Sequence, residues 1–254
     1  MAIKKADDEN GIHIDPIKQG RATMRMIGTS PLYFNAMSLK VKQTLLLGGG
    51  KKTAAQRQEL KHDPEREFRD SIYQQAKGET LLCFPAPGVK GAMATAALAT
   101  AGITKTSVQR LIFLPQQMIN IWGRPYLKMD VVRSADMNKT PDVRTRAFLP
   151  RWCAEVDIAY AMPTLSAYSI ASLLQNAGVI CGIGDFRQEK GKGGYGTFAV
   201  AGSKDMGDWQ AHWDEITQDA REVQQDAMDY PESADRETEQ LMAILIGEKA
   251  RRAA

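Results

Sequence analysis

The order of the apolar segments between residues 21 and 202 is the feature that most constrains the fold of this chain. Alternating apolar residues, with β-branched and aromatic side chains among them, indicate strands, and a spacing of about 3.6 residues indicates helices. Within these segments we identify the order strand, helix, strand, strand, helix, strand, which predicts an α+β fold with a ferredoxin-like (RRM-like) βαββαβ core. The predicted strands are 21–35, 81–84, 107–122, 153–161 and 197–201, and the predicted helices are 36–47, 63–75, 89–101 and 165–176.

Proline and glycine residues set the predicted limits of several elements. Asp63 followed by Pro64 suits a helix N-terminus, because the first helical residue needs no amide hydrogen. Residues 85–88, a Pro-Ala-Pro-Gly run, are predicted as a turn. Gly178 is predicted to end the helix that precedes it, and Pro115 to separate two strands.

The chain is predicted to divide into three regions. Residues 1–20 are charged and aperiodic, which indicates a flexible arm, and residues 21–202 form the domain outlined above. Within that domain residues 123–152 are polar, basic and rich in turn-forming residues, so we expect a long irregular insertion, and such loops are commonly functional. The third region is 203–254, with helical patterns at 208–228 and 232–249.

The formal net charge of +3 conceals a division along the chain. From Ser203 onward there are 6 Lys/Arg and 13 Asp/Glu, a balance of −7; the remaining 27 basic and 17 acidic residues give residues 1–202 a balance of +10. A basic body suits a polyanion, and an acidic extension suits docking on that body or on a neighbouring molecule. An ordinary amphipathic helical extension with an acidic solvent face is the alternative explanation.

Several functional classes find no support in the sequence. No apolar run approaches the length of a membrane span and no signal-peptide pattern opens the chain, so we expect a cytoplasmic protein without a membrane partner. Cys83, Cys153 and Cys181 are predicted to be buried free thiols. The 3 histidines share no metal-ligand spacing, and no P-loop or nucleophile-elbow motif occurs, so no metal, cofactor or catalytic residue is expected.

The glycine-rich segment 182–196 is the strongest candidate for a ligand-binding loop. Its six glycines let the backbone approach a ligand closely, and the cations among them favour an anion. The segment follows a predicted helix and precedes a predicted strand, whereas a dinucleotide-binding loop follows a strand and opens a helix. A flexible connector is the alternative interpretation. The binding candidates here are Gly182, Gly184, Arg187, Lys190, Lys192, Gly193, Gly194 and Gly196.

The predicted insertion supplies further cations interleaved with aromatic residues. This composition suits single-stranded nucleic acid, because cations follow phosphates and rings stack on bases. The alternative is that the aromatic residues anchor the insertion to the core. Asp136 and Asp142 also lie there, and a metal-dependent ribonuclease that uses one of these carboxylates is an enzymatic alternative. The cationic candidates are Arg133, Arg144 and Arg146, and the aromatic residues are Trp122, Tyr126, Phe148 and Trp152.

Three of these features resemble the RAMP superfamily of CRISPR-associated RNA-binding proteins, in particular the backbone subunits that line guide RNA. One is the glycine-rich segment between the second helix and last strand of a βαββαβ core. Another is the run Phe84-Pro-Ala-Pro-Gly-Val-Lys-Gly-Ala-Met93, which is similar to the superfamily's PGSSLKG motif with both serines replaced. The third is the insertion 123–152, placed like the thumb that crosses bound RNA. The run from Pro85 to Ala92, of the form P-x-x-x-x-K-x-A, and the run from Gly182 to Lys190, of the form G-x-G-D-F-R-x-E-K, are also similar to a conserved protein of tailed phages and prophages, a resemblance that spans about residues 21–202.

The resemblance implies a partner and site residues. It implies that the chain binds RNA. We therefore predict a single-stranded nucleic-acid-binding protein, with RNA favoured and single-stranded DNA close behind, that contacts the backbone largely without sequence preference and forms cooperative filaments. Lys90 would point toward the phosphates, with Arg144 and Arg146 on the thumb. A phage-encoded protein would act in the bacterial host cytoplasm, and its acidic C-terminal helices would pack on a neighbouring copy or compete for the basic surface. The alternative is an assembly or scaffolding protein that acts through protein contacts alone.

Overall fold

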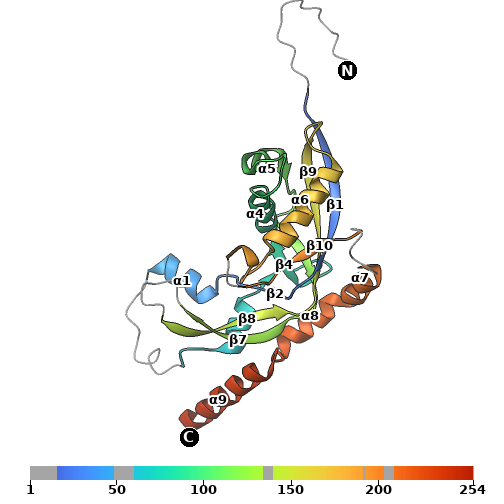
Figure 1. Cartoon of the computed structure of the whole chain (residues 1–254). Helices are drawn as coiled ribbons and strands as arrows, with labels where there is room; N and C mark the ends of the chain where they lie inside the picture. The colour runs from blue at the N-terminus through green and yellow to red at the C-terminus, as the bar shows by residue number, and fades with distance from the viewer. Residues whose placement is uncertain (1–15, 49–59, 134–139, 191–192, 203–208, 254) are drawn as a thin grey trace, which may run out of the picture.

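The structure of this chain, a computed structural model, describes residues 16–48, 60–133, 140–190, 193–202 and 209–253. Figure 1 shows a main sheet covered by helices, a smaller sheet beside it and a run of helices that ends at the C-terminus. The predicted arm lies mostly outside the described residues. Its residues 18–20 belong to the first strand instead, because they continue the backbone pairing with the strand alongside.

The main sheet has the strand order β10-β1-β9-β6-β4-β3, with β5 also paired to β9. Strand β9 lies between β1 and β6, and α4 and α6 form the two connections, which is the split arrangement of a ferredoxin-like core. The structure therefore confirms the α+β fold and the βαββαβ order. The strands are β1 Lys18–Gly28, β3 Tyr73–Gln74, β4 Leu82–Pro85, β5 Ile112–Phe113, β6 Met118–Trp122, β9 Cys153–Met162 and β10 Phe198–Val200.

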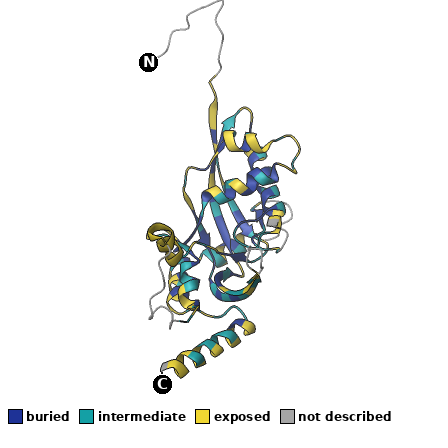
Figure 2. Ribbon diagram, turned by 90° about the vertical axis from the view of Figure 1, so that its left-hand side faces the viewer, coloured by how far each residue is buried: buried dark blue, intermediate teal, exposed yellow. Residues whose placement is uncertain are grey.

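Helices α4 and α6 cover one face of the main sheet (Figures 1 and 2). Small residues allow close packing: Ala92 of α4 is buried, and a Cβ at Gly178 of α6 would lie 2.0 Å from the carbonyl oxygen of Phe198. The prediction that Gly178 ends the helix is wrong, because this glycine serves the contact with β10 and the helix continues beyond it. The bounds are α4 Ala86–Ala96 and α6 Ala167–Ile180.

Two other helices have limits that differ from the prediction. Residues 86–88 begin α4 and do not form a turn, because proline is well suited to the first helical turn, where no amide hydrogen is needed. Helix α3 begins at Pro64 as predicted but ends at Asp70, because the chain turns there into β3.

The region 107–122 is not entirely strand. Residues Lys105–Leu111 form α5, whose N-cap residue Thr104 accepts a hydrogen bond from the backbone N–H of Ser107 at 3.1 Å. Strand pairing begins only after this helix, and Pro115 separates β5 from β6 as predicted. The N-cap thus overrides the β-branched composition of the segment.

The insertion that was expected to be irregular is a β-hairpin. Strands β7 (Tyr126–Arg133) and β8 (Pro141–Leu149) pair antiparallel, and β2 (Leu32–Tyr33) joins β8 to complete a three-stranded sheet. Buried and less buried positions alternate at the start of β7, but the match between polarity and burial is lost at the exposed Val131 and in β8, where Thr145, Arg146 and Ala147 are buried in succession. Asp136 lies outside the described residues, as do the others of 134–139.

The C-terminal helices dock on the body of the same chain. Trp213 of α7 packs against Ile27, Trp122 and Cys153 on the face of the main sheet opposite to α4 and α6, with the two tryptophan rings 5.2 Å apart. The helix predicted at 208–228 is broken at Asp219, where φ is 47°. The bounds are α7 Trp209–Thr217, α8 Ala220–Asp229 and α9 Arg236–Ala253.

Acidic residues of this C-terminal extension pair with cations on and beside the hairpin. The extension therefore compensates basic charge within its own chain, and only its outward faces are left for the neighbouring copy on which it was expected to pack. Exposed ion pairs contribute little individually, so their main effect is on where the helices lie. The pairs are Arg151–Glu215 (2.6 Å), Arg124–Asp226 (3.1 Å), Arg124–Glu232 (2.8 Å) and Lys128–Asp235.

Cys83, Cys153 and Cys181 are buried and unpaired, which confirms the prediction for the cysteines. Burial raises the pKa of the Cys83 thiol to about 11 and that of Cys153 to about 12, so both stay protonated near neutral pH. Within the part of the chain that the structure describes, no helix has both the length and the apolar character to cross a membrane.

Asp235 fixes the start of α9 against β7. Its carboxylate pairs with Lys128 and accepts a hydrogen bond from the backbone N–H of Thr238 at 2.9 Å, and these contacts lower its pKa to about 2. Because the folded-state pKa lies below the unfolded value, the carboxylate stabilises the fold above about pH 4, and this contribution is lost as the pH falls toward 2. We expect Asp235→Asn to be less stable than wild type at neutral pH, with a difference that shrinks over this window.

Urea unfolding of both proteins at about pH 7, 4 and 2.5 measures this difference. Glu239→Gln, an exposed change on the same helix, is the matched control. A difference between wild type and Asp235→Asn that stays constant down to the lowest pH would contradict the role given to the carboxylate.

Candidate nucleic-acid interface

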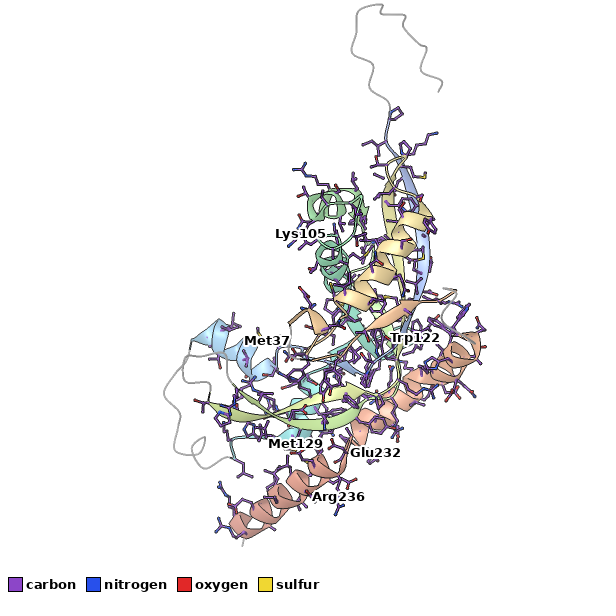
Figure 3. The ribbon with its side chains drawn as sticks, in the orientation of Figure 1. Met37, Lys105, Trp122, Met129, Glu232 and Arg236 are labelled. Atoms are coloured by element: carbon purple, nitrogen blue, oxygen red, sulfur yellow. The ribbon has the colours of Figure 1, made fainter. Side chains whose placement is uncertain are left out.

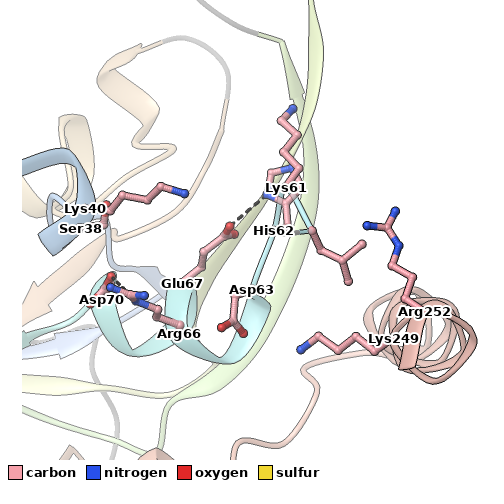
Figure 4. A pocket seen from close by; sticks show the side chains of 11 residues that line it. Ser38, Lys40, Lys61, His62, Asp63, Arg66, Glu67, Asp70, Lys249 and Arg252 are labelled. Atoms are coloured by element: carbon pink, nitrogen blue, oxygen red, sulfur yellow. Dashed lines mark hydrogen bonds and ion pairs between the residues drawn. The ribbon is translucent and has the colours of Figure 1, made fainter. Parts of the chain in front are cut away.

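A cleft of about 500 Å³ lies between strand β8, the start of helix α1 (Leu39–Leu47) and helix α3. We call it the β8 cleft. A second cavity of about 570 Å³, the α9 cavity, adjoins it and reaches the C-terminal end of α9 (Figure 4). Ser38, Lys61, His62 and Glu67 line both. The polar residues that β8 contributes to the cleft are Asp142, Arg144, Thr145 and Arg146.

Arg146 has the most unusual surroundings of the predicted binding residues. Only 8% of it is exposed, and burial lowers its pKa. Its guanidinium lies 3.0 Å from the carboxylate of Asp185 and 4.6 Å from the ring centre of Phe186. Its Nη1 and the hydroxyl of Thr145 are buried without a hydrogen-bond partner among the described residues. A buried donor at the wall of a cleft is costly unless an acceptor reaches it, and a phosphate oxygen is a suitable acceptor.

The glycine-rich segment packs against this region through backbone hydrogen bonds. It folds over β2: the backbone N–H of Asp185 donates to the carbonyl of Tyr33 at 3.0 Å, and that of Gly196 to the carbonyl of Pro31 at 2.8 Å. The segment also closes on itself, since the N–H of Ile183 donates to the carbonyl of Gly196 at 2.9 Å. The alternative of a flexible connector does not fit the described part of this segment.

Most glycines of this segment are required by packing. A Cβ at Gly196, where φ is 71°, would lie 1.7 Å from the carbonyl oxygen of Ile183, and a Cβ at Gly193 would lie 2.1 Å from that of Phe186. Gly182 and Gly184 are similarly enclosed, whereas a Cβ at Gly194 would have none of the described residues within 4 Å. Four of these glycines therefore lie close to the protein's own chain and not to a ligand. Of the five, only Gly194 is both exposed and without a described residue near its Cβ position.

Aromatic side chains hold the segment and the hairpin together. The ring of Tyr33 contacts those of Phe148, Phe186 and Tyr195, with centroids 5.0, 5.2 and 4.9 Å apart. Burial and the nearby carboxylate of Asp130 raise the pKa of Tyr33, so its hydroxyl stays protonated. Trp122 and Trp152 are buried as well. Of the two interpretations of the aromatic residues, the structure supports that of core anchors for Trp122, Phe148 and Trp152.

The remaining predicted residues are spread more widely. Arg144 lines the β8 cleft, and Arg133 is exposed at the far end of β7. Arg187 lies 3.7 Å from Glu189. Lys90 donates from Nζ to the carbonyl of Gln109 at 3.0 Å, which places it at the contact between α4 and α5 and not among the residues that line the cleft. Lys190 ends a short 3₁₀ helix, Gln188–Lys190, and Lys192 lies outside the described residues.

The cleft also contains residues that the sequence did not single out. The imidazole of His62 lies between two carboxylates, with Nδ1 3.0 Å from Glu67 Oε1 and Nε2 3.3 Å from Asp142 Oδ1. Lys61 pairs with Asp142 as well. The available signal was the Lys-His pair directly before the Asp-Pro helix start, but only tertiary contact with β8 reveals its place.

Asp142, a candidate for strand cleavage, is held by cations. Lys61, His62 and Arg144 surround it and lower its pKa, so it is ionised and paired near neutral pH. Among the described residues, no three His, Cys, Asp or Glu side chains lie together so that they could hold a metal ion. The local chemistry of Asp142 is that of an anchor between β8 and the start of α3.

No protein-family model matches this chain, and no curated protein does. Among solved structures it is similar to the crystal structure of Cmr6 from Pyrococcus furiosus, with 11% sequence identity, over 72% of this chain and 99% of that chain. The TM-score is 0.37, a similarity too low to carry a conclusion about function. The α+β assignment rests on the strand order and connections described above.

Proposed function

We propose that this chain binds single-stranded nucleic acid along the β8 cleft. It contacts the sugar-phosphate backbone and prefers RNA to DNA. The observation that carries this proposal is Nη1 of Arg146, a buried cationic donor without a partner among the described residues in the wall of the cleft. Arg144 and Lys61 add positive charge at the same wall. Charge-assisted bonds to phosphate would satisfy these groups without reading the bases.

The preference for RNA follows from the resemblance to the RAMP superfamily. In this proposal the β7–β8 hairpin is the thumb and the glycine-rich segment packed against it is the RNA-facing loop. The residues of this loop proposed to contact the strand are Arg187, Lys190, Lys192 and Gly194. The contact of Arg146 with Asp185 and Phe186 supports a single surface made by the two elements. The anchoring role of the aromatic residues favours binding through phosphates over stacking on bases.

Self-association along the strand is part of the proposal. Helix α1 has no buried residue, and Leu45, Leu46 and Leu47 are 70%, 82% and 80% exposed. A helix of 9 residues is marginal alone, and a contiguous exposed apolar surface commonly marks a protein contact. We propose that another copy covers this surface of α1 when filaments form on nucleic acid. Sedimentation with and without single-stranded RNA measures the size of the assembly.

Fluorescence anisotropy with labelled single-stranded RNA, single-stranded DNA and duplex tests the proposed function. We expect salt-sensitive binding to single strands, with the logarithm of the affinity falling by about 0.7 per phosphate contact for each unit of log salt. The RNA should be recovered intact. Cleavage in Mg²⁺ that is lost in Asp142→Ala would replace binding by a ribonuclease function. If the protein binds no nucleic acid even at low salt, the alternative of an assembly protein that acts through protein contacts alone would replace the proposal.

Arg144→Glu should weaken binding to every single strand about tenfold or more, because it places a carboxylate where a phosphate must pass. Lys105→Glu on the distant helix α5 makes the same change in net charge and is the matched control (Figure 3). Reversal of Lys190 and Lys192 to Glu tests the loop in the same assay. Equal losses in Arg144→Glu and Lys105→Glu would show that net charge alone matters and would contradict the cleft.

A further inference from the structure

The C-terminal extension is not uniformly acidic. Twelve of its 13 acidic residues precede Gln240, and several of them pair with the body, whereas Lys249, Arg251 and Arg252 stand together at its end. The acidic part therefore fixes the helices in place, and the last turns of α9, which end at the C-terminus labelled in Figure 1, contain the basic residues.

This basic end faces the α9 cavity. Figure 4 shows Lys249 and Arg252 reaching toward α3 from one side, with Lys61 and Lys40 on the other sides. Arg66 of α3 also lines the cavity. Three separate segments of the chain thus direct cations at one space.

The carboxylates in the cavity do not account for all of these cations. Arg66 lies 3.9 Å from Asp70, and Arg252 lies 2.7 Å from Glu248. Across the described ranges, neither Lys40 nor Lys249 has a carboxylate within the 4.0 Å of an ion pair. These two ammonium groups come from α1 and α9, on different sides of the cavity.

The α9 cavity continues the β8 cleft. Lys61 and His62 line both, so a strand in contact with Arg144 and Arg146 would pass these two residues before it reached Lys249. A path lined by cations at intervals suits a polyanion that extends beyond one cavity.

We propose that the basic end of α9 binds the phosphate backbone of the same strand, so that the C-terminal helix is a second wall of the binding site. This inference rests on the proposed function. It reverses the expectation that the extension competes for the basic surface, because its acidic part holds the fold together while its basic end enlarges that surface.

The decisive comparison is Lys249→Glu against Arg236→Glu in the full-length protein. Both residues are exposed on α9 and both variants change the net charge equally, but Arg236 lies at the opposite end of the helix from the cavity (Figure 3). We expect Lys249→Glu to weaken binding of single-stranded RNA about fivefold to tenfold and to lower the salt slope by about 0.7, with Arg236→Glu near wild type. Lys249→Gln should show a smaller loss of the same kind.

Each other result overturns the inference in a recognisable way. Equal losses in Lys249→Glu and Arg236→Glu would show a long-range charge effect. Unchanged affinity in Lys249→Glu, while Arg144→Glu binds weakly, would remove α9 from the site and leave the β8 cleft intact. A lowered melting temperature with unchanged affinity would show that Lys249 serves only the helix end or α3. Failure of the wild type to bind would remove the proposed function itself.

Discussion

Gln224→Ala should lower the free energy of unfolding by about 3 kcal/mol, because each buried backbone group left without a partner costs about 1–3 kcal/mol. Gln224 is 0% exposed in α8. Its Oε1 accepts from the backbone N–H groups of Leu81 at 2.8 Å and Leu82 at 3.0 Å, and its Nε2 donates to the carbonyls of Ile121 at 2.8 Å and Gly123 at 3.1 Å. One side chain thus joins the C-terminal extension to two strands of the main sheet.

Gln225→Ala is the matched control, since Gln225 is the next residue of the helix and, among the described residues, its amide bonds only to the exposed carboxylate of Asp229. Urea unfolding should show a loss of at most about 0.5 kcal/mol for this variant. Similar small losses for both variants would mean that the extension is an accessory to the fold. The expected large difference between Gln224→Ala and Gln225→Ala would show that the C-terminal extension is part of the fold. Its removal would then expose apolar and backbone groups of the sheet.

The main sheet could be predicted because its strands carry their signal locally. Alternation in 153–161 and the helical spacing in 165–176 each reflect one buried face, and the order of such segments determines the βαββαβ core. The hairpin could not be predicted because its strands lack such a local signal. In β8 the polar Thr145 and the charged Arg146 are buried in succession, and in β7 Val131 is exposed, so polarity does not follow burial there as it does along β9.

The site was harder to predict, because its chemistry depends on contacts between distant segments. Arg144 and Arg146 are two residues apart on β8, yet one is exposed and the other is buried against Asp185. Nothing local distinguishes them. His62 becomes part of the cleft only through Asp142, 80 positions along the chain. Composition could identify a basic body, but it could not say which cations are already paired with the C-terminal extension.

The glycines of the loop show a further limit of sequence reasoning. Glycine in a predicted binding loop suggests room for a ligand, and the same residue is equally needed where two backbone segments of one protein touch. The structure separates these cases, because an added Cβ meets the chain's own carbonyls at Gly193 and Gly196 but meets no described residue at Gly194.

Gly196→Ala should therefore lower the free energy of unfolding by about 3 kcal/mol or more, combining a strained positive φ with a Cβ in contact with the carbonyl of Ile183. Gly194→Ala should change it by at most about 0.5 kcal/mol. Thermal or urea unfolding of the two variants measures the difference, and anisotropy measures what each does to binding.

Gly194→Glu tests whether the loop contacts the ligand. If the loop faces the nucleic-acid strand, this variant keeps wild-type stability and binds more weakly. Equal stability of Gly196→Ala and Gly194→Ala would contradict the packing of the loop, whereas a stable Gly194→Glu with unchanged affinity would confine the strand to the β8 cleft.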